Sequence, residues 1–268
     1  MRVTRLLLCA LLGALPAHAG PSCTVIADAA SGQILKEDGP CRQRVTPAST
    51  FKIAISLMGF DSGFLKDEHT PLLPFRQGYP DWLPAWRTAT DPTSWIRNSV
   101  VWYSQQVTQS LGPQRFQQYV TALHYGNENV SGDPGKNNGL TRAWLSSSLQ
   151  ISPLEQAVFL EKLVRHELPV SARAVEMTER ITLYTTLPGG WEIHGKTGSG
   201  FPRKADGSQD EAHGYGWFVG WATLGHRTIV FARLIQDDAP QKVSAGYRAR
   251  DALLQELPGI LASTAAPH

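Results

Sequence analysis

The stretch Pro47-Ala48-Ser49-Thr50-Phe51-Lys52 opens a predicted helix. Apolar side chains recur at helical spacing in and behind it, namely Phe51, Ile53, Ala54, Leu57 and Met58. Ser49 and Lys52 are three residues apart, so a helix places both on one face. A serine hydroxyl attacks only when a base takes its proton. A lysine serves as that base only when it is neutral or has been converted into a more basic group. Ser-x-x-Lys alone also occurs by chance in many chains.

A second motif, Lys196-Thr197-Gly198, lies at the end of a predicted strand over Trp191–Thr197. A lysine there can sit beside a nucleophile and attract a substrate carboxylate. Gly198 permits a close approach of the backbone. Taken alone, the triplet is equally consistent with a turn at the end of a strand.

Two further triplets stand in the middle of the chain. Ser99-Val100-Val101 offers a second serine hydroxyl, which can relay a proton to a leaving nitrogen. An ordinary serine at a helix end is the alternative. Tyr125-Gly126-Asn127 by itself predicts a helix C-terminus with a glycine cap.

The middle of the chain is predicted to be helical. Asp91-Pro92 is an N-cap followed by a first-turn proline, and Gly112-Pro113 separates two helices. Ser152-Pro153-Leu154-Glu155 is a capping box that opens another helix. These signals indicate a helical lobe over about residues 61–184.

The two ends of the chain supply the strands. Cys23–Asp28 and Gln33–Glu37 form a predicted hairpin near the N-terminus. Gly216–Thr223 and Thr228–Ile235 form another, and Ala245–Leu257 is a closing helix that Pro258 stops. The pattern predicts an α/β (α+β) fold, with an α/β lobe from about 20–60 and 185–262. The cleft between the lobes is the expected site.

The N-terminus has the pattern of a secretory signal peptide. Arg2 and Arg5 precede a short apolar run, and Ala17-His18-Ala19 fits the cleavage rule, which puts the mature start at Gly20. The run is too short to span a membrane. We therefore expect residues 1–19 to be removed and the mature protein to be soluble, periplasmic or secreted, without a membrane anchor.

Charge and ligand spacing exclude two function classes. Removing the leader takes away two arginines, so basic residues fall from 25 to 23 and equal the 23 acidic ones. Nucleic-acid binding by phosphate neutralisation is not expected for a chain of zero net charge without a basic run. No His/Cys/Asp spacing matches a zinc site, so no metal is expected.

The mature chain retains two cysteines, Cys23 and Cys41. An even number in an exported chain favours a disulfide, and the predicted hairpin brings the two residues together. Two free thiols are the alternative.

In this order, the motifs resemble those of the class D (oxacillinase-type) serine β-lactamases. The signature of that family is Ser-x-x-Lys, Ser-x-Val, Tyr-Gly-Asn and Lys-Thr-Gly, whereas penicillin-binding proteins and class A enzymes carry Ser-Asp-Asn as the second motif. The resemblance extends from about Cys23 to Leu257. Further matches are Trp144-Leu145, Ile151-Ser152-Pro153-Leu154-Glu155-Gln156, His194-Gly195-Lys196 and Gly216-Trp217-Phe218-Val219-Gly220-Trp221.

The resemblance implies a single catalytic domain over residues 20–268, with an antiparallel sheet flanked by helices plus an all-helical lobe. It implies β-lactam ring opening through an acyl-enzyme on Ser49, and hence antibiotic resistance. Lys52 would carry a carboxyl group from carbon dioxide and act as general base, and Ser99 would protonate the leaving nitrogen. No other cofactor is implied.

The remaining site residues follow from the same resemblance. Val101 and Leu145 would form an apolar wall around Lys52, and Trp144 would donate its indole N–H to the carbamate. Lys196, Thr197, Gly198 and Arg250 would bind the substrate, with Arg248 as the rival arginine. The backbone N–H groups of Ser49 and Ser199 would form the oxyanion hole.

One position departs from the family pattern. Class D chains usually have an aromatic residue after Lys-Thr-Gly, and here Ser199 takes its place. The backbone N–H survives that change, but the cleft loses a large ring, so the substrate range is open. The alternatives in function are a penicillin-binding transpeptidase or carboxypeptidase and a β-lactam sensor domain. The partners expected are small β-lactams, in a monomer or homodimer.

Overall fold

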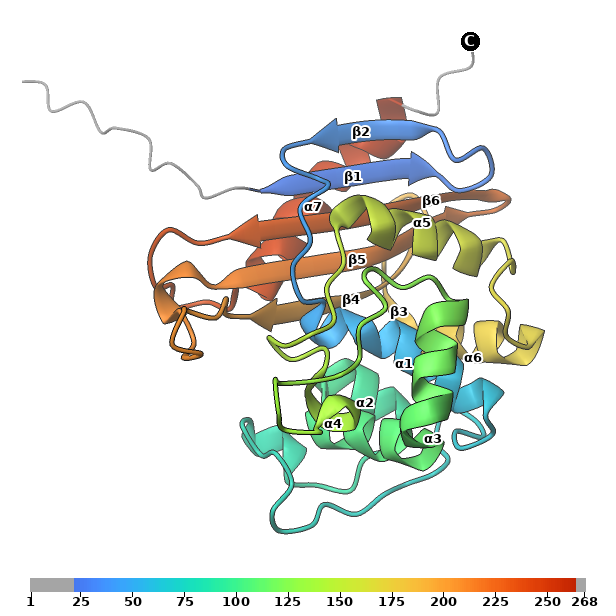
Figure 1. The fold of residues 1–268 in the computed structure, drawn as a ribbon. Coiled ribbons are helices and arrows are strands. Elements are labelled where there is room, and N and C mark those ends of the chain that lie inside the picture. Colours follow the sequence, from blue (N-terminus) through green and yellow to red (C-terminus); the bar gives the residue numbers. More distant parts are fainter. Residues whose placement is uncertain (1–21, 264–268) are drawn as a thin grey trace, which may run out of the picture.

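Six strands form one antiparallel sheet in the order β2-β1-β6-β5-β4-β3 (Figure 1). The structure, a computed structural model, describes residues 22–263. The strands are β1 (Cys23–Asp28), β2 (Ile34–Asp38), β3 (Leu183–Thr186), β4 (Glu192–Gly200), β5 (Tyr215–Leu224) and β6 (Arg227–Gln236). The first eight residues of β5 are buried, because helices cover both faces of this central strand.

Helices flank the sheet and fill the second lobe. They are α1 (Lys52–Asp61), α2 (Pro92–Asn98), α3 (Val101–Ala122), α4 (Gly139–Arg142), α5 (Pro153–Val164), α6 (Ala172–Thr182) and α7 (Ala245–Ser263), with 3-10 turns η1 (Ala48–Phe51), η2 (Pro84–Trp86) and η3 (Glu211–His213). In Figure 1, α7 lies behind the sheet and α5 in front of it, while α1 to α4 gather below β4.

Helix α1 is the link between the two lobes. It follows η1, which contacts β4, and it packs against α3 and α6. Every residue from Lys52 to Phe60 is buried, as expected of a helix that is enclosed on all sides. The Ser-x-x-Lys motif therefore enters the interior of the molecule at the junction of sheet and helical lobe.

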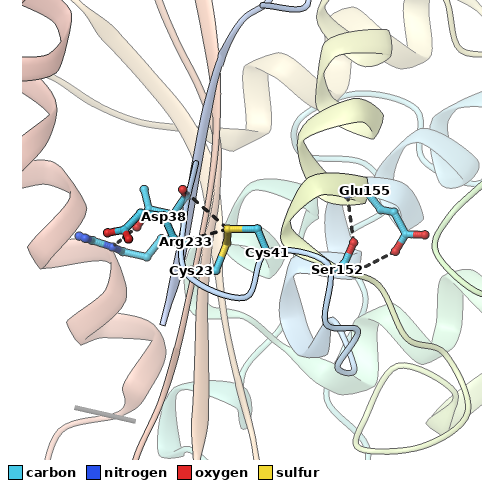
Figure 2. The surroundings of a disulfide bond; sticks show 7 residues. Cys23, Asp38, Cys41, Ser152, Glu155 and Arg233 are labelled. Carbon is cyan, nitrogen blue, oxygen red and sulfur yellow. Dashed lines mark hydrogen bonds between the residues drawn. A yellow bond between two sulfur atoms is a disulfide. The ribbon is translucent and has the colours of Figure 1, made fainter. Parts of the chain in front are cut away.

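Two predicted helix starts are confirmed. The Ser152 side chain accepts a hydrogen bond from the Glu155 N–H, and the Glu155 carboxylate accepts one from the Ser152 N–H at 2.9 Å (Figure 2). Asp91 caps α2 in the same reciprocal way with Ser94. The predicted break at Gly112-Pro113 is also present, because Gly112 has a φ of 73° inside α3.

The predicted disulfide is confirmed. Cys23 on β1 and Cys41 are bonded, with their Cα atoms 5.2 Å apart (Figure 2). A bridge over 18 residues stabilises by about 3 kcal/mol in the chain-entropy model.

Several predicted strand and helix boundaries differ from those of the structure, most of them by one residue. β2 begins at Ile34 rather than Gln33, and β4 continues through the Lys-Thr-Gly triplet to Gly200 because β5 pairs with it over that whole length. Pro258 does not end α7, which continues to Ser263. Leu257 and Leu261 on either side of the proline are both buried in the core under the sheet. Burial of the two leucines is worth about 1.5–3 kcal/mol each, which offsets the roughly 3 kcal/mol cost of an interior proline.

Tyr125-Gly126-Asn127 is not the helix cap that the sequence predicts. Helix α3 ends at Ala122, and His124 is the left-handed residue that follows it, with a φ of 49°. Gly126 has a different reason to be glycine. Its φ is 59°, and a Cβ there would lie 2.0 Å from the carbonyl oxygen of Gln150.

Helix α5 was predicted to belong to the helical lobe. It packs on β1 and β6 and therefore belongs to the sheet layer.

The predicted leader, residues 1–19, lies outside the described residues. Within residues 22–263, no helix has both the length and the apolar character needed to cross a bilayer.

Candidate active site

Ser49 and Lys52 meet at the start of α1. Lys52 Nζ donates a hydrogen bond to Ser49 Oγ at 3.1 Å. Ala48, just before the serine, has a φ of 50°, a strained value for a residue with a side chain and one that is frequent at functional sites. The predicted pairing of serine and lysine on one face is therefore present.

The Lys-Thr-Gly strand lies directly against this turn. A Cβ on Gly198 would be 2.8 Å from the Pro47 carbonyl oxygen and 3.1 Å from the Ser49 nitrogen. Only a glycine permits this approach without displacing backbone atoms. β3 pairs with β4 only as far as His194, so the segment beyond it borders η1 instead.

Lys52 is fully buried, with an exposed fraction of 0%. Its neighbours along the chain, Phe51 and Ile53, are apolar and buried as well. Burial, with a further contribution from the nearby charge of Lys196, holds the pKa of Lys52 well below its ordinary value. The amine is thereby favoured in its neutral, nucleophilic form.

Trp144 carries an unsatisfied donor in this core. Its side chain is fully buried, and its ring lies 5.8 Å from that of Phe51. Within residues 22–263, its Nε1 atom has no hydrogen-bond partner. An unpaired buried N–H is costly and calls for an explanation, for which an anionic acceptor near Lys52 is suited. No cluster of His, Cys, Asp or Glu in the described residues is arranged to hold a metal.

Lys196 lies in β4 and is also buried, and its Nζ donates to the Thr197 carbonyl at 3.0 Å. Burial, assisted by the positive charge of Arg250, lowers the pKa of Lys196 to about 7. A bound carboxylate would favour the charged ammonium and raise that pKa again.

Ser99 ends α2 in a left-handed conformation, with a φ of 58°. It lines a cavity of about 450 Å³ together with Lys196, Thr197 and Arg250. The structure thus brings together the predicted proton donor and the predicted carboxylate-binding residues, which come from α2, β4 and α7.

The two candidate arginines of α7 differ in their surroundings. Arg250 lines the Ser99 cavity, and its guanidinium lies between the rings of Tyr184 and Tyr247, at 5.4 and 4.9 Å. Arg248 instead forms two hydrogen bonds of 2.6 Å to the carboxylate of Asp237. Arg250 is therefore the one placed beside Lys196 and Thr197.

A second cavity, of about 700 Å³, is lined by Ala48, Leu145 and Ser199. Ser199 Oγ lies 2.6 Å from Ser244 Oγ and accepts from the N–H of Gly246 at 2.9 Å. The serine that replaces the usual aromatic residue is thus bonded to the start of α7. Leu145 is half-buried and borders this cavity.

Sequence reasoning missed the role of Tyr125 and Gln156. Gln156 Nε2 donates to Tyr125 Oη and to Thr50 Oγ1, both at 3.1 Å. The Tyr125 ring lies 4.9 Å from Phe51. Tyr125 of the Tyr-Gly-Asn motif therefore packs against Phe51 and is linked through Gln156 to Thr50, the residue after the nucleophile.

Sequence reasoning also missed a contact between two loops. Arg203 donates to the Ser146 carbonyl at 2.6 Å and to Asp133 Oδ1 at 2.8 Å. Asp133 Oδ1 also accepts from Ser147 at 2.8 Å. Because Ser146 is two residues beyond Trp144, these bonds hold the turn that carries the unpaired indole.

The architecture agrees with comparisons to known proteins. Residues 22–258 match the penicillin binding protein transpeptidase domain. Beta-lactamase OXA-9 of Klebsiella pneumoniae is 45% identical over 248 residues, which cover 89% of this chain and 88% of that protein. Beta-lactamase OXA-1 of Escherichia coli is 36% identical over 212 residues, which cover 78% and 73%. The crystal structure of the OXA-427 class D β-lactamase has a TM-score of 0.86 at 49% identity, covering 90% of this chain and 99% of that one.

The chain therefore belongs to the penicillin-binding protein transpeptidase family and, within it, to the class D serine β-lactamases. The fold and the motif order predicted from the sequence agree with this assignment.

Proposed function

We propose that this protein hydrolyses β-lactam antibiotics through an acyl-enzyme on Ser49 and so confers resistance to them. The observation that carries the proposal is the fully buried Lys52, whose Nζ lies 3.1 Å from Ser49 Oγ. A neutral lysine in this position can take the proton of the Ser49 hydroxyl, whereas a charged lysine cannot.

Carboxylation of Lys52 by carbon dioxide fits the residues around it. A neutral amine is the form that reacts with carbon dioxide, and the depressed pKa of Lys52 favours that form. The unpaired Trp144 Nε1–H and the Ser49 hydroxyl are the donors that would hold the resulting anion. A carbamate is an anion that can act as general base at neutral pH, and it is regenerated in each catalytic cycle.

Acylation uses the groups around Ser49. The Ser49 proton leaves toward Lys52 as Oγ bonds to the lactam carbonyl carbon. Backbone N–H groups of Ser49 and Ser199 stabilise the carbonyl oxygen as it becomes negative. The lactam C–N bond breaks, and Ser99 relays the proton from Lys52 to the departing nitrogen, which leaves Lys52 free to act as base again. Water then gives its proton to Lys52 as its oxygen bonds to the acyl carbon, and that proton returns to Ser49 Oγ when the bond between the acyl carbon and Oγ breaks.

The substrate is oriented by its carboxylate. Lys196, Thr197 and Arg250 line the cavity beside Ser99. We expect a carboxylate held there to orient the lactam ring toward Ser49. A guanidinium binds a carboxylate in a bidentate pair, which fixes direction as well as charge.

The enzyme acts outside the cytoplasm under this proposal. The support is the signal-peptide pattern of residues 1–19 and the Cys23–Cys41 disulfide, a bond typical of oxidising compartments.

Turnover separates hydrolysis from a transpeptidase or sensor. We expect the enzyme to hydrolyse many equivalents of the chromogenic cephalosporin nitrocefin, with Ser49→Ala inactive. A burst of one equivalent followed by no further hydrolysis, under saturating bicarbonate, would instead identify a protein that stays acylated.

A further inference from the structure

The 450 Å³ cavity beside Ser99 carries more positive charge than one carboxylate requires. Four basic side chains line it, from α2, α6, β4 and α7, namely Arg97, Arg180, Lys196 and Arg250. Among the described residues that line this cavity, none is an aspartate or a glutamate. An unbalanced cluster of this kind attracts anions.

Acidic residues outside the cavity offset only part of this charge. Arg180 pairs with Glu68 at 3.1 Å, and Arg250 with Asp251 at 2.7 Å. In each pair one partner, Arg180 or Asp251, is exposed to solvent, which weakens the interaction. Arg97 is exposed, and none of the ion pairs within residues 22–263 involves it. The lowered pKa of Lys196, caused by burial and by Arg250, is in keeping with a positive local field.

Aromatic surface lies next to these charges. Tyr184 and Tyr247 line the same cavity, are 46% and 47% exposed, and hold Arg250 between their rings. Flat, exposed rings favour a planar ligand. The cavity thus combines positive charge with stacking surface.

Substrate chemistry places one group of the antibiotic here. In cephalosporins, the ring carbon C4 carries the carboxylate, and the adjacent carbon C3 carries a variable substituent. If Lys196, Thr197 and Arg250 hold the carboxylate, the C3 substituent lies beside it, in the cavity that Arg97 and Arg180 border. The 700 Å³ cavity lined by Ala48, Leu145 and Ser199 is left for the acyl side chain.

We propose that Arg97 and Arg180 form an anion subsite that selects cephalosporins whose C3 substituent is a negatively charged heteroaromatic ring. This inference rests on the proposed β-lactamase function. It assigns two residues outside the motifs a role in specificity, and it predicts that a cationic C3 substituent is disfavoured.

Three cephalosporins with the same aminothiazolyl-methoxyimino acyl chain isolate the C3 group. The substituent is an acidic triazinone in ceftriaxone, a neutral acetoxymethyl in cefotaxime and a pyrrolidinium cation in cefepime. Each is measured as a competitor of nitrocefin hydrolysis, so that slow turnover does not prevent a reading. We expect affinity to fall in the order anionic, neutral, cationic, and the spread to shrink with added salt.

The variants Arg97→Gln and Arg180→Gln test the two side chains. The anionic-to-cationic affinity ratio should fall about threefold for each and roughly tenfold for the double variant. Arg173→Gln is the matched control, because Arg173 also lies on α6 but does not line the cavity. An unchanged ratio in the double variant overturns the subsite while leaving the β-lactamase function intact. Absence of any nitrocefin hydrolysis by the wild type overturns the proposed function and the subsite with it.

Discussion

Arg203 Nε donates a hydrogen bond to the Ser146 carbonyl oxygen at 2.6 Å, across 57 residues of sequence. The same guanidinium reaches Asp133 at 2.8 Å. Ser146 itself has a φ of 52°, a strained value that surrounding bonds must hold in place. The loop after β4 therefore fixes the turn that follows Trp144, whose ring packs against Phe51 next to Lys52.

Loosening this link should weaken the site around Lys52. Arg203→Gln removes the charge-assisted bond to Asp133, which is worth about 1.5–3 kcal/mol. We expect the bicarbonate concentration for half-maximal activity to rise about fivefold in Arg203→Gln. The value for Arg203→Lys should lie between those of the wild type and Arg203→Gln. Steady-state nitrocefin hydrolysis over a bicarbonate series measures it. A lower melting temperature with an unchanged bicarbonate requirement would reduce Arg203 to a packing role.

Trp144→Phe keeps the ring beside Phe51 but removes the unpaired N–H. In carbon-dioxide-free buffer it should lose only the stability that the smaller ring costs in packing, because the donor bonds to nothing there. Under bicarbonate it should be less stable than the wild type, and deacylation should slow more than acylation. Melting curves and single-turnover kinetics in both buffers measure this. Trp102→Phe is the control, since its Nε1 donates to the Trp86 carbonyl at 2.9 Å, and it should lose stability equally in both.

The pH dependence of kcat/KM should be bell-shaped. On the acid side, activity falls because protonation of Lys52 removes the neutral amine. Because the pKa of Lys52 is lowered, this fall occurs at a lower pH than it would for an ordinary lysine. On the alkaline side, Lys196 loses its proton, with a pKa of about 7 when Lys52 is unmodified. A carboxylated Lys52 is an anion, which favours the charged form of Lys196 and raises that pKa. Profiles with and without bicarbonate should therefore differ in the alkaline limb, and coincident limbs would argue against the modification.

Substitution of the two arginines of α7 should have opposite effects, one on catalysis and the other on stability. Arg250→Ala should lower kcat/KM at least tenfold, equivalent to roughly 1.4 kcal/mol, because it removes a cation from the carboxylate-binding cavity. Arg248→Ala should mainly lower the melting temperature, because it leaves the largely buried Asp237 without its partner. Kinetics and thermal unfolding of both variants decide between them. The reverse pattern would assign the substrate carboxylate to Arg248.

Local signals in the sequence predicted the local geometry of the motifs. The Ser49–Lys52 spacing, the Lys-Thr-Gly strand and the capping box at Ser152 each depend on neighbours within a few residues. They lie where expected because helix and strand periodicity alone bring their side chains together.

What the sequence could not supply depends on contacts between distant segments. Arg203 and Asp133 are 70 residues apart, and neither stands in a motif. The ion pair of Arg248 with Asp237, which separates it from Arg250, was not visible in the sequence. The continuation of α7 past Pro258 likewise depends on the sheet that buries Leu261. Tertiary burial decided each of these over local preference.

The most direct test follows carboxylation of Lys52 and turnover in the same sample. Enzyme freed of carbon dioxide is titrated with ¹³C-bicarbonate, and the ¹³C carbamate resonance and nitrocefin kcat are recorded at each step. We predict one resonance, absent in Lys52→Ala, whose intensity rises in proportion to kcat, and a benzylpenicillin adduct on Ser49 where carboxylation is low. Full kcat without any carbamate resonance, or an adduct on another serine, would contradict the assigned roles of Lys52 and Ser49.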